Sequence, residues 1–195
     1  MRLTSGWKIW IGTALIMLLS ACGTTGGKQE QKSAGIDSLT PSQAARFQEA
    51  LTQLDQQQPK KAENVLESLL RERADVAELW LNLALSQYQQ HNFAAADKTV
   101  TRILATYPRT VQAHNLAGLL AVENGEFKKA EQHYGEALKL SSAYANALYN
   151  MALLQDIYLQ NTAAAVDYYN RYLALVKDDE ATKAWVENLA QSLGR

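Results

Sequence analysis

Cys22, the single cysteine of the chain, is the residue whose surroundings most clearly predict chemistry. It follows a short apolar stretch, residues 9–19, which is preceded by Arg2 and Lys8. A positively charged start, a short apolar core and small residues at a cut site make up a secretory signal peptide. The stretch is too short to cross a bilayer, which takes about 20 apolar residues. We therefore expect a signal peptide ahead of Cys22 and covalent chemistry at its thiol.

Residues 19–22 (LSAC) resemble the lipobox of bacterial lipoproteins. The resemblance implies that the Cys22 sulfur carries a diacylglyceryl group, that the signal peptide 1–21 is removed, and that the new amino terminus is acylated. Gly23 stands where an aspartate would resemble an inner-membrane retention signal. We therefore expect a lipid-anchored protein on the periplasmic face of the outer membrane. The alternatives are an ordinary signal peptide that contains a cysteine, or a small buried cysteine.

The charge balance argues against a nucleic-acid partner. The chain has 19 Lys and Arg against 20 Asp and Glu, and without Arg2 and Lys8 the balance is 17 against 20. A protein that neutralises phosphates needs a basic face, and the sequence has no Lys/Arg cluster. With Cys22 lipidated no disulfide can form, so packing alone must stabilise the folded part.

The remaining side chains show no catalytic pattern. The spacing of His91, His114 and His133 matches no zinc motif of the HxxxH or HExxH kind. The sequence also lacks the GxSxG pattern of serine hydrolases. We therefore predict that the protein is not an enzyme, binds no metal and no small-molecule substrate, and carries no cofactor besides the lipid on Cys22.

The chain changes character near residue 40. Residues 23–40 hold too few large apolar groups to offset the entropy of ordering, so 22–40 is predicted to be the lipidated cysteine and a flexible tether. Thr40, Pro41 and Gln43 then mark a helix start, with a capping hydroxyl, a proline in the first turn and a glutamine three residues on. Beyond them Ala, Leu, Gln and Glu abound, which favours helices.

From residue 43 the sequence repeats with a period of 34. Two sets of small residues recur in it: Ala50, Ala84, Gly118 and Ala152, and then Ala62, Ala96, Ala130 and Ala165. The last member of the second set comes one residue late, which an extra residue in the 159–162 turn would absorb. Two antiparallel helices cross closely only where both lack bulk. The pattern therefore predicts a series of helix pairs.

This period, with the residues that recur in it, resembles the tetratricopeptide repeat. The residues that carry the resemblance are Trp80, Leu83, Ala84, Phe93, Ala96 and Pro108 in the second segment, and Gly118, Gly125, Phe127, Ala130 and Tyr134 in the third. The resemblance implies an all-α solenoid of about four helix pairs. We expect a degenerate first repeat over 41–76, three repeats over 77–110, 111–144 and 145–178, and a C-terminal capping helix over 179–195. The capping helix shows one apolar stripe, made of Ala181, Ala184, Trp185, Leu189 and Leu193.

In tetratricopeptide repeats the first helix of each pair lines a concave face, and the resemblance implies the same here. The expected face is an apolar row with side-chain amides beside it: Phe47, Leu51, Leu81, Asn82, Leu85, Asn115, Leu119, Tyr149, Asn150 and Leu153. The amides could hydrogen-bond an extended peptide while the leucines receive its side chains. No Lys or Arg occupies these positions, which argues against the clamping of a terminal carboxylate. The alternative is that curvature buries the leucines between neighbouring first helices.

These features predict a non-catalytic protein-binding scaffold that is anchored to the outer membrane by lipid. A lipid-anchored tetratricopeptide protein resembles the pilotin-type lipoproteins of type IV pili and secretion systems. That resemblance implies a role in assembling such a complex, with a secretin or another envelope subunit as the partner. The alternatives are a structural subunit of a polysaccharide-export channel and an adaptor for peptidoglycan hydrolases.

Overall fold

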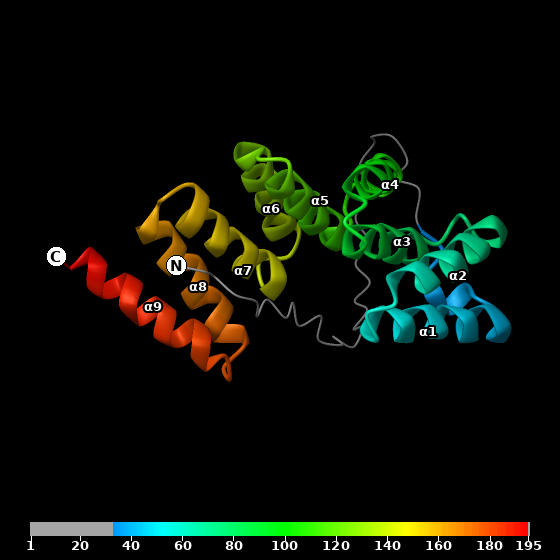
Figure 1. Ribbon diagram of the computed structural model, residues 1–195, viewed down its shortest axis with the longest axis horizontal. Helices are drawn as coiled ribbons and strands as arrows, with labels where there is room; N and C mark the ends of the chain where they lie inside the picture. Colours follow the sequence, from blue (N-terminus) through cyan, green and yellow to red (C-terminus); the bar gives the residue numbers. More distant parts are fainter. Residues whose placement is uncertain (1–32, 195) are drawn as a thin grey trace, which may run out of the picture.

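The structure is a computed structural model that describes residues 33–194. Within that range the chain forms nine α-helices and no β-strand, which confirms the all-α fold class (Figure 1). The signal peptide and Cys22 lie outside the described residues. None of the helices within residues 33–194 combines the length and apolarity needed to cross a bilayer. The helices are α1 (Pro41–Asp55), α2 (Pro59–Glu72), α3 (Ala77–Gln89), α4 (Phe93–Thr106), α5 (Val111–Glu123), α6 (Phe127–Leu140), α7 (Ala145–Leu153), α8 (Thr162–Leu175) and α9 (Glu180–Leu193).

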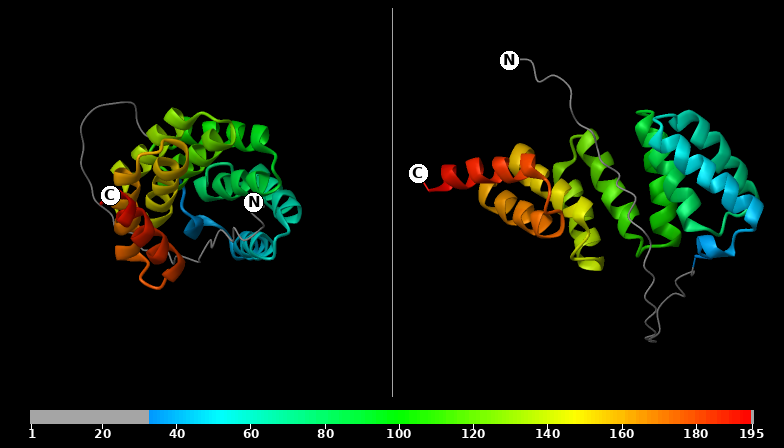
Figure 2. Two further views of the ribbon diagram at one scale, coloured as in Figure 1. Left: turned by 60° about the vertical axis from the view of Figure 1, so that its left-hand side comes forward. Right: turned by 90° about the horizontal axis from the view of Figure 1, so that it is seen from below.

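The helices stack as four antiparallel pairs, α1/α2, α3/α4, α5/α6 and α7/α8, and α9 follows the last pair (Figure 1). Each second helix also packs on the first helix of the next pair. In addition α1 contacts α3, α3 contacts α5, and α5 contacts α7, while the second helices do not contact one another to that extent. The first helices thus lie closer together than the second, and the array curves around them (Figure 2).

Small residues allow the close crossing within each pair. All of the alanines predicted at the crossings are fully buried, with no exposed surface: Ala50, Ala62, Ala84, Ala96, Ala130, Ala152 and Ala165. Gly118 takes the equivalent place in α5, where the ring of Tyr134 occupies the space that a Cβ atom would need. Tyr134 itself is only 1% exposed. The third pair therefore requires glycine at position 118 because the opposite helix presents an aromatic ring.

The turns between the two helices of the first three pairs share one backbone conformation. Gln57, His91 and Gly125 adopt left-handed φ angles of 61°, 58° and 73°. The N–H of the next residue then bonds to the carbonyl five residues back, as Asn92 does to Gln87 at 2.9 Å. This is the Schellman motif, which satisfies carbonyls at the end of a helix. Only the third turn uses glycine, the residue that adopts this conformation without strain.

The extra residue of the fourth repeat lies in a helix rather than in the turn after it. A π-helical segment, η2 (Leu154–Tyr158), continues α7, and the N–H of Leu159 bonds to the carbonyl of Leu154 at 3.0 Å. The left-handed turn residue follows at Gln160, one residue later than the period of 34 places it. The prediction that the 159–162 turn absorbs the slip is therefore wrong. A π-helical turn accommodates one inserted residue without ending the helix.

Residues 33–39 are not part of a flexible tether, as the sequence suggested, but lie against the first two repeats. We refer to them as the N-terminal strap. The N–H of Ala34 donates to the carbonyl of Asp75 at 3.1 Å, and the N–H of Ala77 donates to Ser33 Oγ at 2.8 Å. The strap includes a short 3₁₀ turn, η1 (Ile36–Ser38). The prediction of disorder fails here because backbone pairing with the α2–α3 loop adds to the few apolar contacts.

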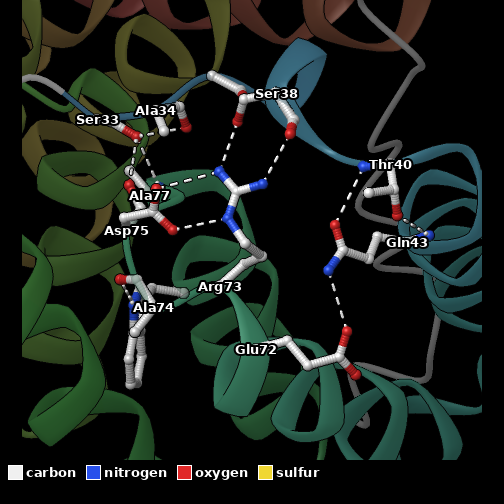
Figure 3. A network of polar contacts seen from close by, with 12 residues as sticks. Ser33, Ala34, Ser38, Thr40, Gln43, Glu72, Arg73, Ala74, Asp75 and Ala77 are labelled. Carbon is white, nitrogen blue, oxygen red and sulfur yellow. Dashed lines mark hydrogen bonds and ion pairs between the residues drawn. The ribbon is translucent and has the colours of Figure 1, made fainter.

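Those apolar contacts come from Ile36 and Leu39, which pack against the core of the first repeat. Arg73, at the end of α2, fixes the strap from the polar side (Figure 3). Its guanidinium donates to the carbonyl and to the hydroxyl of Ser38, both at 2.7 Å. It also pairs with Asp75 at 2.9 Å, and this hydrogen bond lowers the pKa of the Asp75 carboxyl. Charge-assisted bonds of this kind are stronger than neutral ones.

The predicted start of the first helix is confirmed. The N–H of Gln43 donates to Thr40 Oγ1 at 3.3 Å, and the N–H of Thr40 donates to Gln43 Oε1 at 3.0 Å (Figure 3). Together they form a capping box with Pro41 in the first turn.

Helix α9 buries only part of the predicted stripe. Leu189 packs against the last core cluster together with Val186, which like Thr182 is 7% exposed, whereas Trp185 and Leu193 are 50% and 51% exposed. The capping residue Asp179 turns Thr182 inward, because it accepts from the Thr182 N–H at 3.0 Å and from its hydroxyl at 2.8 Å. The apolar stripe read from the sequence is thus rotated, and α9 leaves large apolar side chains at the surface.

The glycine at position 118 provides a test of the packing. Gly118→Ala should lower the free energy of unfolding by about 1–3 kcal/mol, because the added Cβ collides with the Tyr134 ring. Gly135→Ala, the same change in α6 with open space around the new atom, should instead raise stability by about 0.5–1 kcal/mol through helix propensity. Urea unfolding of both variants measures the difference. Equal effects would contradict the packing described for the third pair.

Candidate functional site

The predicted concave face lies on the first helices of the pairs, and three hydrogen bonds join neighbouring first helices across it. Asn150 Nδ2 of α7 donates to Asn115 Oδ1 of α5 at 3.0 Å. The Tyr88 hydroxyl of α3 donates to Glu123 of α5 at 3.0 Å. Trp185 Nε1 of α9 donates to Asp156 of η2 at 2.8 Å. Side chains that bridge adjacent first helices lie where those helices approach each other, which is the inner face of the curve.

The four leucines that recur on this face are neither fully buried nor fully exposed. Leu51, Leu85, Leu119 and Leu153 are each partly buried. One side of each packs against the buried core beneath it. The other side remains accessible, so the row forms an apolar floor rather than a set of fully buried wedges.

The amides on this face are less available than the sequence suggested. Asn115 is 7% exposed, and its side-chain oxygen is taken by Asn150. Asn82 Nδ2 donates to the carbonyl of Glu78 in its own helix at 2.8 Å. Each amide keeps some unused hydrogen-bonding capacity, as a side-chain amide has two donors and a carbonyl oxygen. The Asn115–Asn150 pair, however, is first a structural link between α5 and α7.

The aromatic and larger apolar members differ in exposure. Phe47 is 8% exposed and belongs to the core of the first repeat, so its predicted place in a binding groove is not supported. Leu81 is partly buried against the second core cluster. Tyr149 packs edge-on against Tyr169 and tilted against Tyr172, with ring centroids 5.9 and 5.0 Å apart. Tyr149 therefore remains accessible only in part.

Trp185 and Asp156 extend this face to the C-terminal end, which the sequence analysis did not anticipate. With the extra residue of η2 included, Trp185 falls in α9 at the place that Asn150 takes in α7. Its ring is half exposed, and its N–H holds Asp156. The signal was present in the sequence, but it becomes visible only when the repeat period is continued through α9 with the inserted residue counted.

Burial controls the titration of the tyrosine that links α3 to α5. Burial raises the pKa of the Tyr88 hydroxyl well above its usual value, and the nearby carboxylate of Glu123 raises it further. The hydroxyl therefore remains a hydrogen-bond donor to Glu123 over the whole physiological range.

Two histidines lie together within the described residues, but they form no metal site. No group of three or more His, Cys, Asp or Glu side chains that could hold a metal ion is found within residues 33–194. His114 and His133 lie side by side, with ring centroids 5.9 Å apart, but His114 Nε2 is engaged by the Pro108 carbonyl at 2.9 Å. Burial, together with His114, lowers the pKa of His133. The pair is explained by packing between α5 and α6.

A sequence model of the tetratricopeptide repeat matches residues 47–108, 81–145 and 115–180, which together span more than half of the chain. No curated protein matches the sequence. Among solved structures, pilF of Pseudomonas aeruginosa has a TM-score of 0.69 at 20% identity, with 77% of this chain and 68% of that chain covered.

Two further structures are similar. The tetratricopeptide protein TTC0263 of Thermus thermophilus has a TM-score of 0.67 at 18% identity, covering 78% of this chain and 84% of its own. The first such domain of Spaghetti (RPAP3), solved with the HSP90 peptide SRMEEVD, has a TM-score of 0.56 at 18% identity, covering 61% and 94%. At these identities the likenesses show the fold alone.

The amide pair predicts an asymmetry between two superficially similar residues. Asn150→Ala should cost about 1–3 kcal/mol of folding free energy, because it leaves the buried Asn115 oxygen without a donor. Asn82→Ala should cost clearly less, since the Asn82 amide bonds only to a carbonyl of its own helix. Thermal and urea unfolding of the two variants gives the comparison. Equal losses would show that the Asn115–Asn150 bond does not link α5 to α7.

Proposed function

The chain belongs to the tetratricopeptide repeat family, and from this we propose that it is a lipid-anchored, non-catalytic scaffold that binds a partner protein on its concave face. Proteins of this family are generally protein-interaction scaffolds rather than enzymes. The observation that carries the proposal is the partly accessible leucine row, Leu51, Leu85, Leu119 and Leu153, along the first helices. An apolar floor on a curved array fits an extended or helical segment of another protein.

The anchor is supported by the sequence around Cys22, and it specifies where the scaffold acts. A diacylglyceryl group on Cys22 and an acyl chain on the new amino terminus supply the two lipid signals that stable membrane attachment requires. Gly23 supports residence on the periplasmic face of the outer membrane. In that setting we propose that the protein assists the assembly of a pilus, secretion or related envelope complex. A secretin or another subunit of that complex is the partner that this role favours.

The strap shortens the free part of the anchor. Because Ser33 and Ala34 are bonded to the α2–α3 loop, the tether between the lipid and the body is residues 23–32 at most. Ten residues span at most about 33–36 Å, the length of a fully extended chain. In the proposed anchored form, the point where the strap joins the array therefore stays within that distance of the membrane surface.

Removal of the thiol tests the anchor. Cys22→Ser should abolish incorporation of a labelled fatty acid and leave the unprocessed precursor, because the serine cannot carry the thioether-linked lipid. Metabolic labelling with a fatty-acid analogue, followed by separation of inner and outer membranes, reports both modification and location. Wild-type protein that takes up no label would contradict the proposed anchor, whatever the outcome for the groove.

Substitution of the leucine row tests the binding face. Leu85→Gln together with Leu119→Gln should at least halve the amount of partner that is crosslinked and captured from membranes, because two apolar contacts become polar. Leu175→Gln serves as the matched control, since Leu175 is 46% exposed on the second helix α8 and should leave capture unchanged. Melting curves confirm that each variant remains folded. Unchanged capture by the folded double variant would place the interface elsewhere.

A further inference from the structure

The two layers of the array differ in charge, although the chain as a whole is nearly neutral. The first helices, which line the concave face, are α1, α3, α5, α7 with η2, and α9. They carry only two basic side chains, Arg46 and Lys183, against the carboxylates Glu49, Asp55, Glu78, Glu123, Asp156, Glu180 and Glu187. The second helices carry more basic than acidic residues, the basic ones being Lys60, Lys61, Arg71, Lys98, Arg102, Lys128, Lys129, Lys139 and Arg171.

The two basic side chains of the first helices do not neutralise the concave face. Arg46 reaches back to the second helix of its own pair, where it bonds to Glu72 and to Ser68, both at 2.7 Å. Lys183 pairs with Glu180 of its own helix at 2.6 Å. The ion pairs found within residues 33–194 include none of Asp55, Glu123 and Asp156.

Glu123 and Asp156 lie on the side of the first helices that faces the groove, and the repeat register assigns Asp55 to the same side. Glu123 accepts from the Tyr88 hydroxyl of the neighbouring first helix, and Asp156 accepts from Trp185 of the next one. Asp55 is exposed and stands two repeat periods before Glu123, at the same place at the end of α1. All three are near the C-terminal ends of first helices, so they lie along one side of the leucine row.

We propose that the concave face selects a partner segment that carries Lys or Arg beside large apolar side chains. This specificity rests on the groove function proposed above and adds the charge of the ligand. The leucine row supplies apolar contacts. The carboxylates of Asp55, Glu123 and Asp156, which form no ion pair within residues 33–194, attract cations and repel acidic segments. Electrostatic complementarity of this kind discriminates between partners more than it raises affinity.

Three synthetic peptides test the charge preference. Both ends of each peptide are blocked, and the leucines are the same in all three. The peptides differ only at three positions, which hold Lys, Gln or Glu. Fluorescence anisotropy measures the dissociation constant of each peptide with the protein. We expect the Lys peptide to bind about tenfold more tightly than the Glu peptide, with Gln between them. Higher salt should reduce this difference, because exposed charges are screened.

A pair of charge-reversed variants separates the groove from the net charge of the protein. Asp55→Lys with Glu123→Lys should reverse the order, so that the Glu peptide binds best. The control, Glu67→Lys with Asp167→Lys, makes the same change of net charge on exposed residues of α2 and α8. It should leave the preference for the Lys peptide in place. Circular dichroism and melting curves verify that both variants are folded.

Each other outcome overturns the inference. Equal binding of the three peptides, no binding of the Lys peptide, or the same reversal in the control variant would each show that the groove carboxylates do not select the ligand. If that happens while the Leu85→Gln/Leu119→Gln variant still loses its captured partner, the proposed binding face stands and only the charge preference is wrong. If capture is also unaffected, the binding face itself is wrong.

Discussion

The close approach of two helices within each pair is the constraint on which the rest of the structure depends. It requires residues without bulk at one point on each helix, and fully buried alanines occupy nearly all of these points. Gly118 shows how strict the requirement is, since the Tyr134 ring occupies the space that even a Cβ atom at this position would need. Once every pair crosses at the same point, the pairs stack with the same offset. The curvature, and with it the concave face, then follows from repetition.

The period of 34 made the fold readable from the sequence, because each recurring small residue reports the same contact. What could not be read are the features that occur once. The strap has only Ile36 and Leu39 to suggest packing. Its two bonds to Asp75 and Ala77, made by the Ala34 N–H and the Ser33 hydroxyl, leave no trace in composition. The sequence showed that the fourth repeat contains one extra residue, but it did not show that this residue lies in the π-helical turn η2. A helix can absorb an insertion as readily as a loop can.

The candidate site was predictable to the level of the helix face and no further. The leucine row lies where the period places it, whereas the mutual bond of Asn115 and Asn150 depends on the distance between neighbouring first helices. Sequence spacing does not contain that distance. Likewise, Phe47 falls at a groove position in the first repeat but is buried, because it joins a core cluster with side chains of α2 and α3. The separation of charge between layers was hidden for a related reason, since a net charge near zero averages over two faces.

The strap also determines how the array bears a mechanical pull. In a linear array the outermost repeat is the one that frays, because it has a neighbour on one side only. Here a tension applied ahead of Ser33 does not act on the free start of α1. It acts on the bonds that Ser33 and Ala34 make with the α2–α3 loop and on the grip of Arg73 on Ser38. The force therefore enters between the first two repeats and bypasses the repeat that would otherwise peel away first.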